Sequence, residues 1–276
     1  MTSPDIDHVR ARSFGGVAAN YDKFRPRYPD ELVDDVVAML PGRHVLEIGA
    51  GTGIATAAFA ARGMAVTCVE PDAEMAAVLS MKLAGNSDLH VDVATFEDWS
   101  AARPTGMPGF DGLICAQAWH WTDPKTRWAY AGAALHEDAV LALFWNDDNF
   151  ADLRVRDAYT SAYERRGIEI RSVRPAPEDI PSKDNIVNDE WPDGWPPNHH
   201  REASAYFTSM RTRRYNWTRR VPVSDYVARM NTTSAHIILP AQVRDDMTAE
   251  LMATLTSYGD DVVLEMTTDL ATAIRR

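Results

Sequence analysis

The chain has 276 residues, of which 45% are hydrophobic and 25% charged, a composition typical of a globular protein with a sizeable core. Its net charge of −12 disfavours a nucleic-acid-binding surface, because such surfaces need clustered lysine and arginine. The first residues contain no apolar signal segment and no run approaches 18 apolar residues, so we expect a cytoplasmic protein without membrane contact.

Strands and helices are predicted to alternate over residues 29–145. Pro29 begins a segment with leucine and valine on one helical face, which predicts a helix over 29–40. Apolar runs then predict five strands, at 43–48, 64–70, 88–93, 110–116 and 138–145. The helices expected between them include 54–62, 73–84 with Asp72 as its N-cap, and 123–135. Apolar strands separated by helices indicate an α/β protein with a parallel sheet covered on both faces.

The alternation ends after Trp145. A helix is expected at 150–167, and the segment 171–201 that follows contains six prolines. That segment is too long for a plain connection and is typical of a lid, a binding loop or a disordered segment. The remaining elements are predicted as a strand at 206–217, a helix capped by Ser224, a helix that begins at Pro240 and a strand at 261–272. We therefore predict a single domain, 1–276, with an insertion at 150–205 and a final strand pair that returns to the same sheet.

A glycine-rich turn is the most informative motif of the chain. In residues 45–53, VLEIGAGTG, an apolar strand that carries Glu47 runs into glycines at every second position. Such a turn brings backbone N–H groups close to a ligand, because glycine lacks Cβ and tolerates positive φ. The next predicted strand ends in Glu70, an acid that can accept hydrogen bonds from both hydroxyls of a ribose. The turn and the acid together indicate a site for a nucleoside-type cofactor.

This combination resembles the class I S-adenosylmethionine-dependent methyltransferases, whose first motif, E-x-G-x-G-x-G, matches residues 47–53. The segment 110–121, with His120 between two tryptophans, is similar to a subgroup that includes trans-aconitate methyltransferase-like enzymes, and so are 21–29 and 143–146. The resemblance implies S-adenosylmethionine as cofactor and S-adenosylhomocysteine as product. It also implies a Rossmann-like, doubly wound, seven-stranded sheet of order 3-2-1-4-5-7-6 with strand 7 antiparallel, and the insertion at 150–205 as a lid over the acceptor site.

The same resemblance implies a set of cofactor-binding residues. The methionine part of the cofactor is expected across the glycine turn, the ribose at the end of the second strand, the adenine after the third strand and the reacting sulfonium beside the fourth. An N-terminal segment is expected to fold over the cofactor. In this sequence these positions are Tyr21, Arg25, Glu47, Gly49, Ala50, Gly51, Gly53, Glu70, Pro71, Thr95, Phe96, Ala116 and Gln117. Glu47 either organises the turn or meets the amino group of the cofactor.

The adenine position departs from the family pattern. The acid that usually meets the adenine amino group falls on Thr95, whose neutral oxygen accepts a weaker hydrogen bond than a carboxylate. Phe96 is expected to offer its backbone N–H to the ring, and Asp92 is the alternative acceptor. Glu97 and Asp98 are expected to form a solvated helix start.

His120 is the candidate catalytic residue. Its imidazole could take a proton from an acceptor hydroxyl, since histidine titrates near neutral pH. It could equally line the site or be held structurally between Trp119 and Trp121, each of which is either a wall of the site or part of the core.

Two other cofactor classes fit the sequence poorly. The nicotinamide fingerprint needs a third glycine where this chain has Ile54 or Thr56. Some small-molecule methyltransferases bind a divalent ion with an acid after the fourth strand and an Asp-Asn pair after the fifth, but this chain has Ala116 and Gln117 after the fourth strand. No metal is therefore predicted, and the polar cluster 146–149 is expected to cap the helix that follows it.

The predicted function is methyl transfer to a small-molecule acceptor, with an oxygen (carboxylate or hydroxyl) as the preferred atom by analogy. The alternatives are a methyltransferase acting on nitrogen or carbon, and a cofactor-binding protein without catalysis that acts through a partner interface. No nucleic-acid or membrane partner is expected, and a homodimer is one assembly considered.

Overall fold

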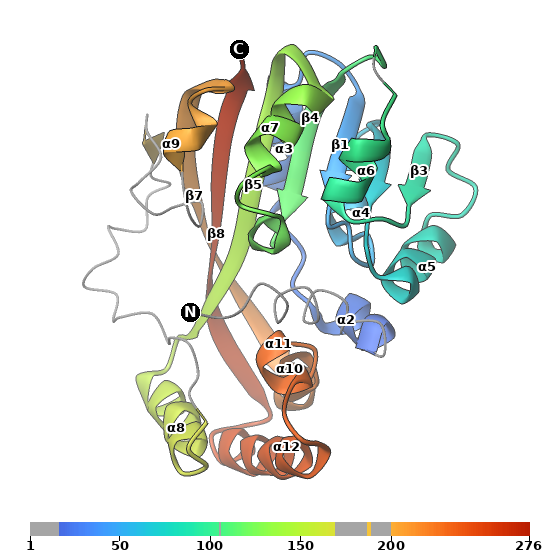
Figure 1. The fold of residues 1–276 in the computed structure, drawn as a ribbon. Coiled ribbons are helices and arrows are strands. Elements are labelled where there is room, and N and C mark those ends of the chain that lie inside the picture. Colours follow the sequence, from blue (N-terminus) through green and yellow to red (C-terminus); the bar gives the residue numbers. More distant parts are fainter. Residues whose placement is uncertain (1–16, 105, 169–186, 189–199) are drawn as a thin grey trace.

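The computed structural model describes residues 17–104, 106–168, 187–188 and 200–276. Most of the proline-rich segment predicted at 171–201 therefore lies outside the described residues. Figure 1 shows an upper α/β part around a central sheet, and a lower group of helices reached by three long strands. Within the described residues, no helix combines the length and apolar character needed to span a membrane.

One eight-stranded sheet organises the molecule, in the order β3-β2-β1-β4-β5-β8-β7-β6. β1 to β5 pair in parallel, whereas β8 is antiparallel to both of its neighbours, β5 and β7. This confirms the predicted order, with β7 and β8 as the expected sixth and seventh strands and the two-residue β6 as an additional edge. The strands are β1 His44–Ile48, β2 Ala65–Val69, β3 Leu89–Asp92, β4 Phe110–Ala116, β5 Leu135–Phe150, β6 Val187–Asn188, β7 Phe207–Pro222 and β8 Asp261–Arg275.

Helices cover both faces of the parallel strands, as predicted. The helices are α2 Ala18–Phe24, α3 Asp30–Met39, α4 Ile54–Ala60, α5 Ala73–Lys82, α6 Phe96–Ala102, α7 Arg127–Ala134, α8 Leu153–Glu164, α9 His200–Ala203, α10 Val223–Met230, α11 Ser234–Ile237 and α12 Ala241–Thr256, with a 3-10 turn η2 at Trp119–Trp121. Alternate residues of β1 point to opposite faces. Leu46 packs in the core under α6 and α7, and Val45 in the core under α3, α4 and α5.

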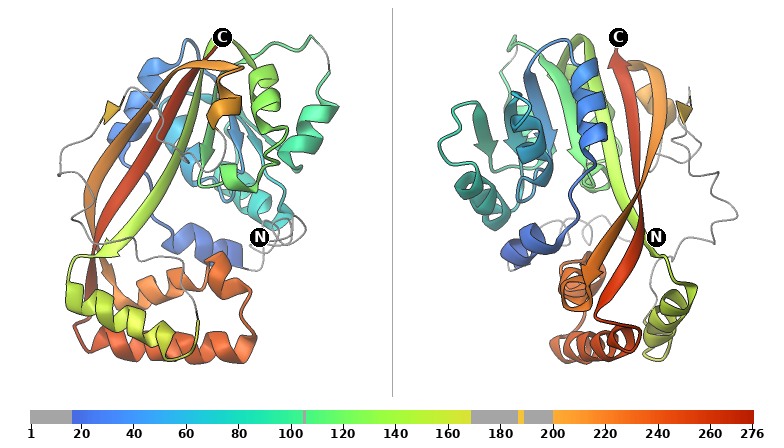
Figure 2. Two further views of the ribbon diagram at one scale, coloured as in Figure 1. Left: turned by 60° about the vertical axis from the view of Figure 1, so that its left-hand side comes forward. Right: turned by 180° about the vertical axis from the view of Figure 1, so that it is seen from behind.

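A third apolar core lies where β5, β7 and β8 continue past the parallel strands. There Phe150, Val221 and Leu264 pack against α8, α10 and α12. Figure 2 shows these strands as one long twisted ribbon that carries the lower helices. β5 was predicted to end at Trp145, but residues 146–149 pair with 265–268 of β8. A two-sided antiparallel ribbon tolerates polar residues, so polarity did not mark the end of the strand.

The helix starts show which local signals were reliable. Asp72 caps α5 as predicted, because its carboxylate accepts hydrogen bonds from the N–H groups of Glu74 and Met75. The predicted cap by Ser224 is wrong, since α10 begins at Val223 after Pro222 and Ser224 lies inside its first turn. The polar cluster 146–149 does not cap α8 either, because that position belongs to Asp152.

Candidate active site

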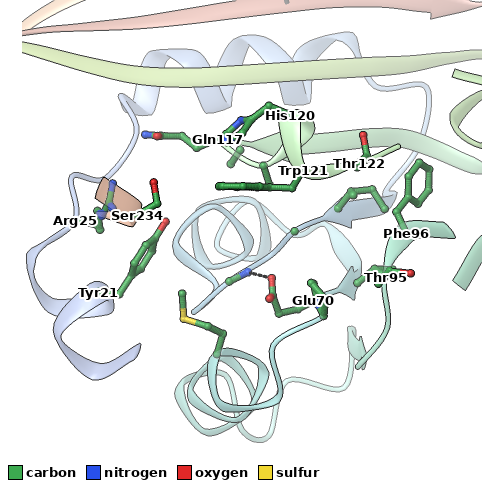
Figure 3. A pocket seen from close by; sticks show the side chains of 18 of the residues that line it. Tyr21, Arg25, Glu70, Thr95, Phe96, Gln117, His120, Trp121, Thr122 and Ser234 are labelled. Carbon is green, nitrogen blue, oxygen red and sulfur yellow. Dashed lines mark hydrogen bonds between the residues drawn. The ribbon is translucent and has the colours of Figure 1, made fainter. Parts of the chain in front are cut away.

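A cavity of about 250 Å³ opens at the carboxyl ends of β1, β2 and β4, the edge at which open α/β sheets bind ligands. Figure 3 shows side chains from both halves of the chain converging on it. The structure brings together most of the predicted site residues on its wall: Tyr21, Arg25, Gly49, Gly51, Glu70, Pro71, Thr95, Phe96, Ala116, Gln117 and His120. Glu47, Ala50 and Gly53 do not line it.

The glycine turn forms the floor of the cavity. Gly49 and Gly51 have φ values of +68° and +56°, in the region that favours glycine. A Cβ atom on Gly49 would lie 2.3 Å from the Cβ of Ala118, so the turn could not pack against the end of β4. A Cβ on Gly51 would meet no atom within 4 Å. Gly49 is therefore required for packing, whereas Gly51 keeps the ligand side of the turn open.

Glu70 joins this turn to the end of β2. Its Oε2 accepts a hydrogen bond from the Gly51 N–H at 2.7 Å, drawn in Figure 3, and its Oε1 accepts one from the Asp72 N–H at 2.9 Å. Burial raises the pKa of Glu70 to about 7, and the two backbone donors oppose that rise. Because a carboxylate offers about four acceptor positions, both oxygens can still accept hydrogen bonds from a ligand.

Three predicted cofactor contacts lie behind the turn instead. Glu47 is 1% exposed and accepts a hydrogen bond from the Thr56 hydroxyl at 2.6 Å. Burial raises the pKa of Glu47 to about 8. Ala50 is buried, and Gly53 is the N-cap of α4, where its Cβ would meet Leu79. In this structure Glu47 contributes to the turn from β1, and Ala50 and Gly53 lie where the chain bends into α4.

The residues at the end of β3 and after it have other roles than those predicted from the sequence. The Thr95 hydroxyl caps α6 by accepting a hydrogen bond from the Asp98 N–H at 3.0 Å. Asp92 is not on the cavity wall, and its Oδ2 accepts a hydrogen bond from the indole N–H of Trp99 at 2.9 Å. Glu97, expected in solvent, lines the cavity and accepts a hydrogen bond from the Asp123 N–H at 2.8 Å.

The end of β4 carries the strained residue of the site. Gln117 has a φ of 59°, unusual for a non-glycine residue, and its N–H donates to the Phe144 carbonyl at 2.9 Å. Such conformations cost roughly 1–3 kcal/mol and concentrate at functional sites. His120 follows on η2, with its ring centroid 4.6 Å from that of Trp121. Trp121 lines the cavity, whereas Trp119 is fully buried in the core.

The remaining side of the cavity is formed by two segments that lie far apart in the sequence, the end of α2 and the start of α11. Arg25, at the end of α2, donates from Nε to the Thr232 hydroxyl at 3.0 Å and from Nη2 to the Thr232 carbonyl at 2.8 Å. Its guanidinium lies 4.7 Å from the centroid of the Tyr21 ring. Thr233, the N-cap of α11, and Ser234, its first residue, thereby reach the cavity wall. The sequence analysis missed both residues, and no local motif marks them.

A buried hydrogen-bond chain holds this wall from behind. The Thr233 hydroxyl donates to the Met230 carbonyl at 2.7 Å and lies 2.9 Å from the Nδ1 of His236. The Nε2 of His236 lies 2.8 Å from the Tyr163 hydroxyl. The chain is satisfied when His236 is neutral, with Nδ1 donating to Thr233 and Nε2 accepting from Tyr163. Burial, with the nearby charge of Arg244, lowers the pKa of His236 to about 4.

This burial predicts an acid-sensitive fold. An unfolded histidine titrates near pH 6.5, so between about pH 6.5 and 4 the unfolded chain binds a proton that the folded chain excludes. The free energy of unfolding should therefore fall by about 3 kcal/mol across that window. Urea denaturation at several pH values measures it. We expect His236→Gln to flatten the slope. An unchanged slope in His236→Gln would contradict the assignment.

The polar cluster 146–149 makes structural contacts. Asp148 forms a two-point ion pair with the buried Arg229, at 2.8 and 2.7 Å. Asn146 accepts a hydrogen bond from the Thr268 hydroxyl at 2.6 Å. Across the described part of the chain, no group of three or more His, Cys, Asp or Glu side chains has the arrangement of a metal site.

The fold and the cavity together define an α/β protein built to hold a nucleoside-type cofactor. Comparison with known proteins agrees. A methyltransferase-domain family model matches residues 46–141. An uncharacterized methyltransferase of Mycobacterium tuberculosis is 36% identical over 136 residues, which are 49% of this chain and 52% of that protein. The match thus spans about half the length of the mycobacterial relative.

Two further comparisons extend the likeness. An uncharacterized methyltransferase of Bacillus velezensis is 31% identical over 150 residues, covering 52% of this chain and 67% of that protein. A solved structure from Anaeromyxobacter dehalogenans, described as a type II methyltransferase, superposes with a TM-score of 0.57 at 22% identity, covering 92% of this chain and 98% of that one. The chain belongs to the S-adenosylmethionine-dependent methyltransferases, and the predicted family and cofactor are confirmed. The predicted subgroup is not tested by these comparisons.

Proposed function

We propose that this protein transfers a methyl group from S-adenosylmethionine to an oxygen atom of a small molecule. The carrying observation is the Glu70 carboxylate, which is fixed beside Gly51 and faces the same cavity as the end of β4. This arrangement supports the proposal, because a carboxylate, an open backbone turn and a strained strand end surround one ligand-sized space.

The cavity wall suggests how the cofactor lies. The methionine part runs over Gly49 and Gly51, and the ribose hydroxyls donate to Glu70. The adenine reaches the segment that begins at Thr95, which Figure 3 shows on the side of the cavity opposite Tyr21 and Arg25. The sulfonium then lies near Gln117, at the end of β4.

The acceptor is assigned to the side formed by Tyr21, Arg25, Gln117, His120 and Ser234. Among the described residues, this side carries the guanidinium of Arg25 and no carboxylate, since the acids on the wall are Glu70 and Glu97. A positive charge attracts an anionic acceptor and repels an ammonium group. The charge balance of this side therefore favours a carboxylate or a neutral hydroxyl over an amine.

The main contribution of the protein to this reaction is the alignment of the two reactants. Bound S-adenosylmethionine supplies a methyl group on an activated sulfonium, and the acceptor oxygen forms the new O–C bond as the C–S bond breaks and its electron pair returns to sulfur. Residues of this chain hold the two reactants in line and exclude water. Such orientation can lower a barrier by roughly 7–11 kcal/mol. A carboxylate acceptor needs no base, whereas a hydroxyl must lose a proton, for which His120 is the candidate.

The role of His120 separates the two acceptor types. If the acceptor is a hydroxyl, we expect His120→Ala to lower kcat 100-fold or more, because the general base is lost. If the acceptor is a carboxylate, kcat should fall only a few-fold. Steady-state kinetics measures kcat, and calorimetry measures the Kd for S-adenosylhomocysteine. That Kd should stay unchanged in both cases. Loss of S-adenosylhomocysteine binding would instead place His120 in the cofactor site.

The function is tested in two stages with the whole chain. Calorimetry with S-adenosylmethionine and S-adenosylhomocysteine measures cofactor binding, and a screen of small carboxylic acids and hydroxyl compounds then follows formation of S-adenosylhomocysteine. We expect binding of both and turnover with at least one oxygen acceptor. The absence of both heat and a melting shift would overturn the proposal. Turnover with amines alone would overturn the assignment of oxygen.

A further inference from the structure

We propose that Glu97 reads the adenine ring, with its carboxylate accepting a hydrogen bond from the exocyclic amino group. The inference rests on the proposed function, since it assumes that the nucleoside end of the cofactor lies after β3. It moves the role of the acid by two positions, from Thr95 to Glu97.

The other candidate acceptors in this region already have partners. The Thr95 oxygen holds the Asp98 N–H as the cap of α6, and as a neutral group it is the weaker acceptor. Both Asp92 oxygens are engaged, Oδ1 with His90 and Oδ2 with Trp99, and Asp92 does not line the cavity. A charged acceptor for the amino group must come from another residue.

Glu97 meets the requirement. Glu97 is one of the residues that line the cavity, and it is partly buried. Its Oε1 is anchored by the Asp123 N–H at 2.8 Å, which ties the start of α6 to the chain that follows η2. Among the described residues, no hydrogen bond engages Oε2. A carboxylate held at one oxygen and open at the other is pre-organised to accept from a ligand, so little side-chain freedom is lost on binding.

The chemistry predicts a specific discrimination. A 6-amino purine donates to a carboxylate, whereas a 6-oxo purine presents a second acceptor at that atom and leaves both groups without a partner. S-adenosylhomocysteine should therefore bind to the unmodified protein at least 30-fold more tightly than S-inosylhomocysteine, its 6-oxo analogue. The discrimination should depend on the charge and acceptor character of Glu97.

Glu97→Gln is the decisive variant. Its amide oxygen can still accept from the Asp123 N–H, so the anchor is kept, while its NH₂ group can donate to the 6-oxo atom. Calorimetry with both nucleosides should show the preference for S-adenosylhomocysteine falling to about three-fold or less. Asp98→Asn is the matched control, because Asp98 is the neighbouring acid at the same helix start and does not line the cavity. That variant should keep the full preference.

The outcomes separate this inference from the proposed function. If the protein binds S-adenosylhomocysteine and Glu97→Gln keeps the preference of the unmodified chain, Glu97 is not the adenine reader and the inference is overturned. Equal binding of both nucleosides by the unmodified protein overturns it as well. If neither nucleoside binds to the unmodified chain, the proposed function itself fails. A merely structural role of Glu97 would weaken both ligands equally and leave their ratio unchanged.

Discussion

Replacing Glu70 with alanine is expected to weaken the binding of S-adenosylhomocysteine 100-fold or more. The carboxylate is positioned by two backbone N–H groups and keeps acceptor positions on both oxygens for the ribose hydroxyls. Hydrogen bonds to a charged group contribute about 1.5–3 kcal/mol each, and every 1.4 kcal/mol is tenfold in affinity. Two lost bonds therefore give the expected factor. Calorimetry on the purified variant measures the change.

A control and a pH series make this test specific. Glu74→Ala removes an exposed acid at the start of α5 and should leave the affinity unchanged. Because the pKa of Glu70 is raised to about 7, the group takes up a proton as the pH falls below that value and accepts less well. Affinity should therefore decline from pH 8 to pH 6 in the unmodified chain and not in Glu70→Ala. Retained binding by Glu70→Ala would remove the basis of the proposed site.

Alanine at Gly49 and at Gly51 is expected to have different consequences. Gly49→Ala should lower the free energy of unfolding by about 2–4 kcal/mol, from the cost of positive φ and the overlap with Ala118. Gly51→Ala pays only the conformational cost of about 1–2 kcal/mol, since its Cβ meets open space. That Cβ would project where the ligand must approach the backbone, so we expect the affinity for S-adenosylhomocysteine to fall tenfold or more.

Denaturant titration and calorimetry on both variants separate the two effects. The pair are controls for each other, because the same substitution is made two residues apart in one turn. The assignment predicts the larger loss of stability in Gly49→Ala and the loss of affinity in Gly51→Ala. Equal losses of stability with unchanged affinity would show that the turn serves the fold alone.

The strand order was implied by the family resemblance. The sequence by itself determined the alternation of strands and helices, the glycine turn and the acid at the end of β2. These features follow from local rules: apolar runs identify buried strands, glycine identifies positive φ, and parallel strands bring their carboxyl ends to one edge. The role of Asp72 as a cap also follows locally, because a side chain reaches the N–H groups two and three residues ahead.

Only the tertiary structure decided which groups share the cavity. Thr233 and Ser234 reach it because Arg25, about two hundred residues away in the chain, binds Thr232. Glu97 lines the wall because the chain after η2 returns to anchor it, and Asp92 is withdrawn because Trp99 folds onto it. The polar run after Trp145 stays in a strand because β8 pairs with it. Such contacts join residues distant in sequence, so no local pattern of residue types can specify them.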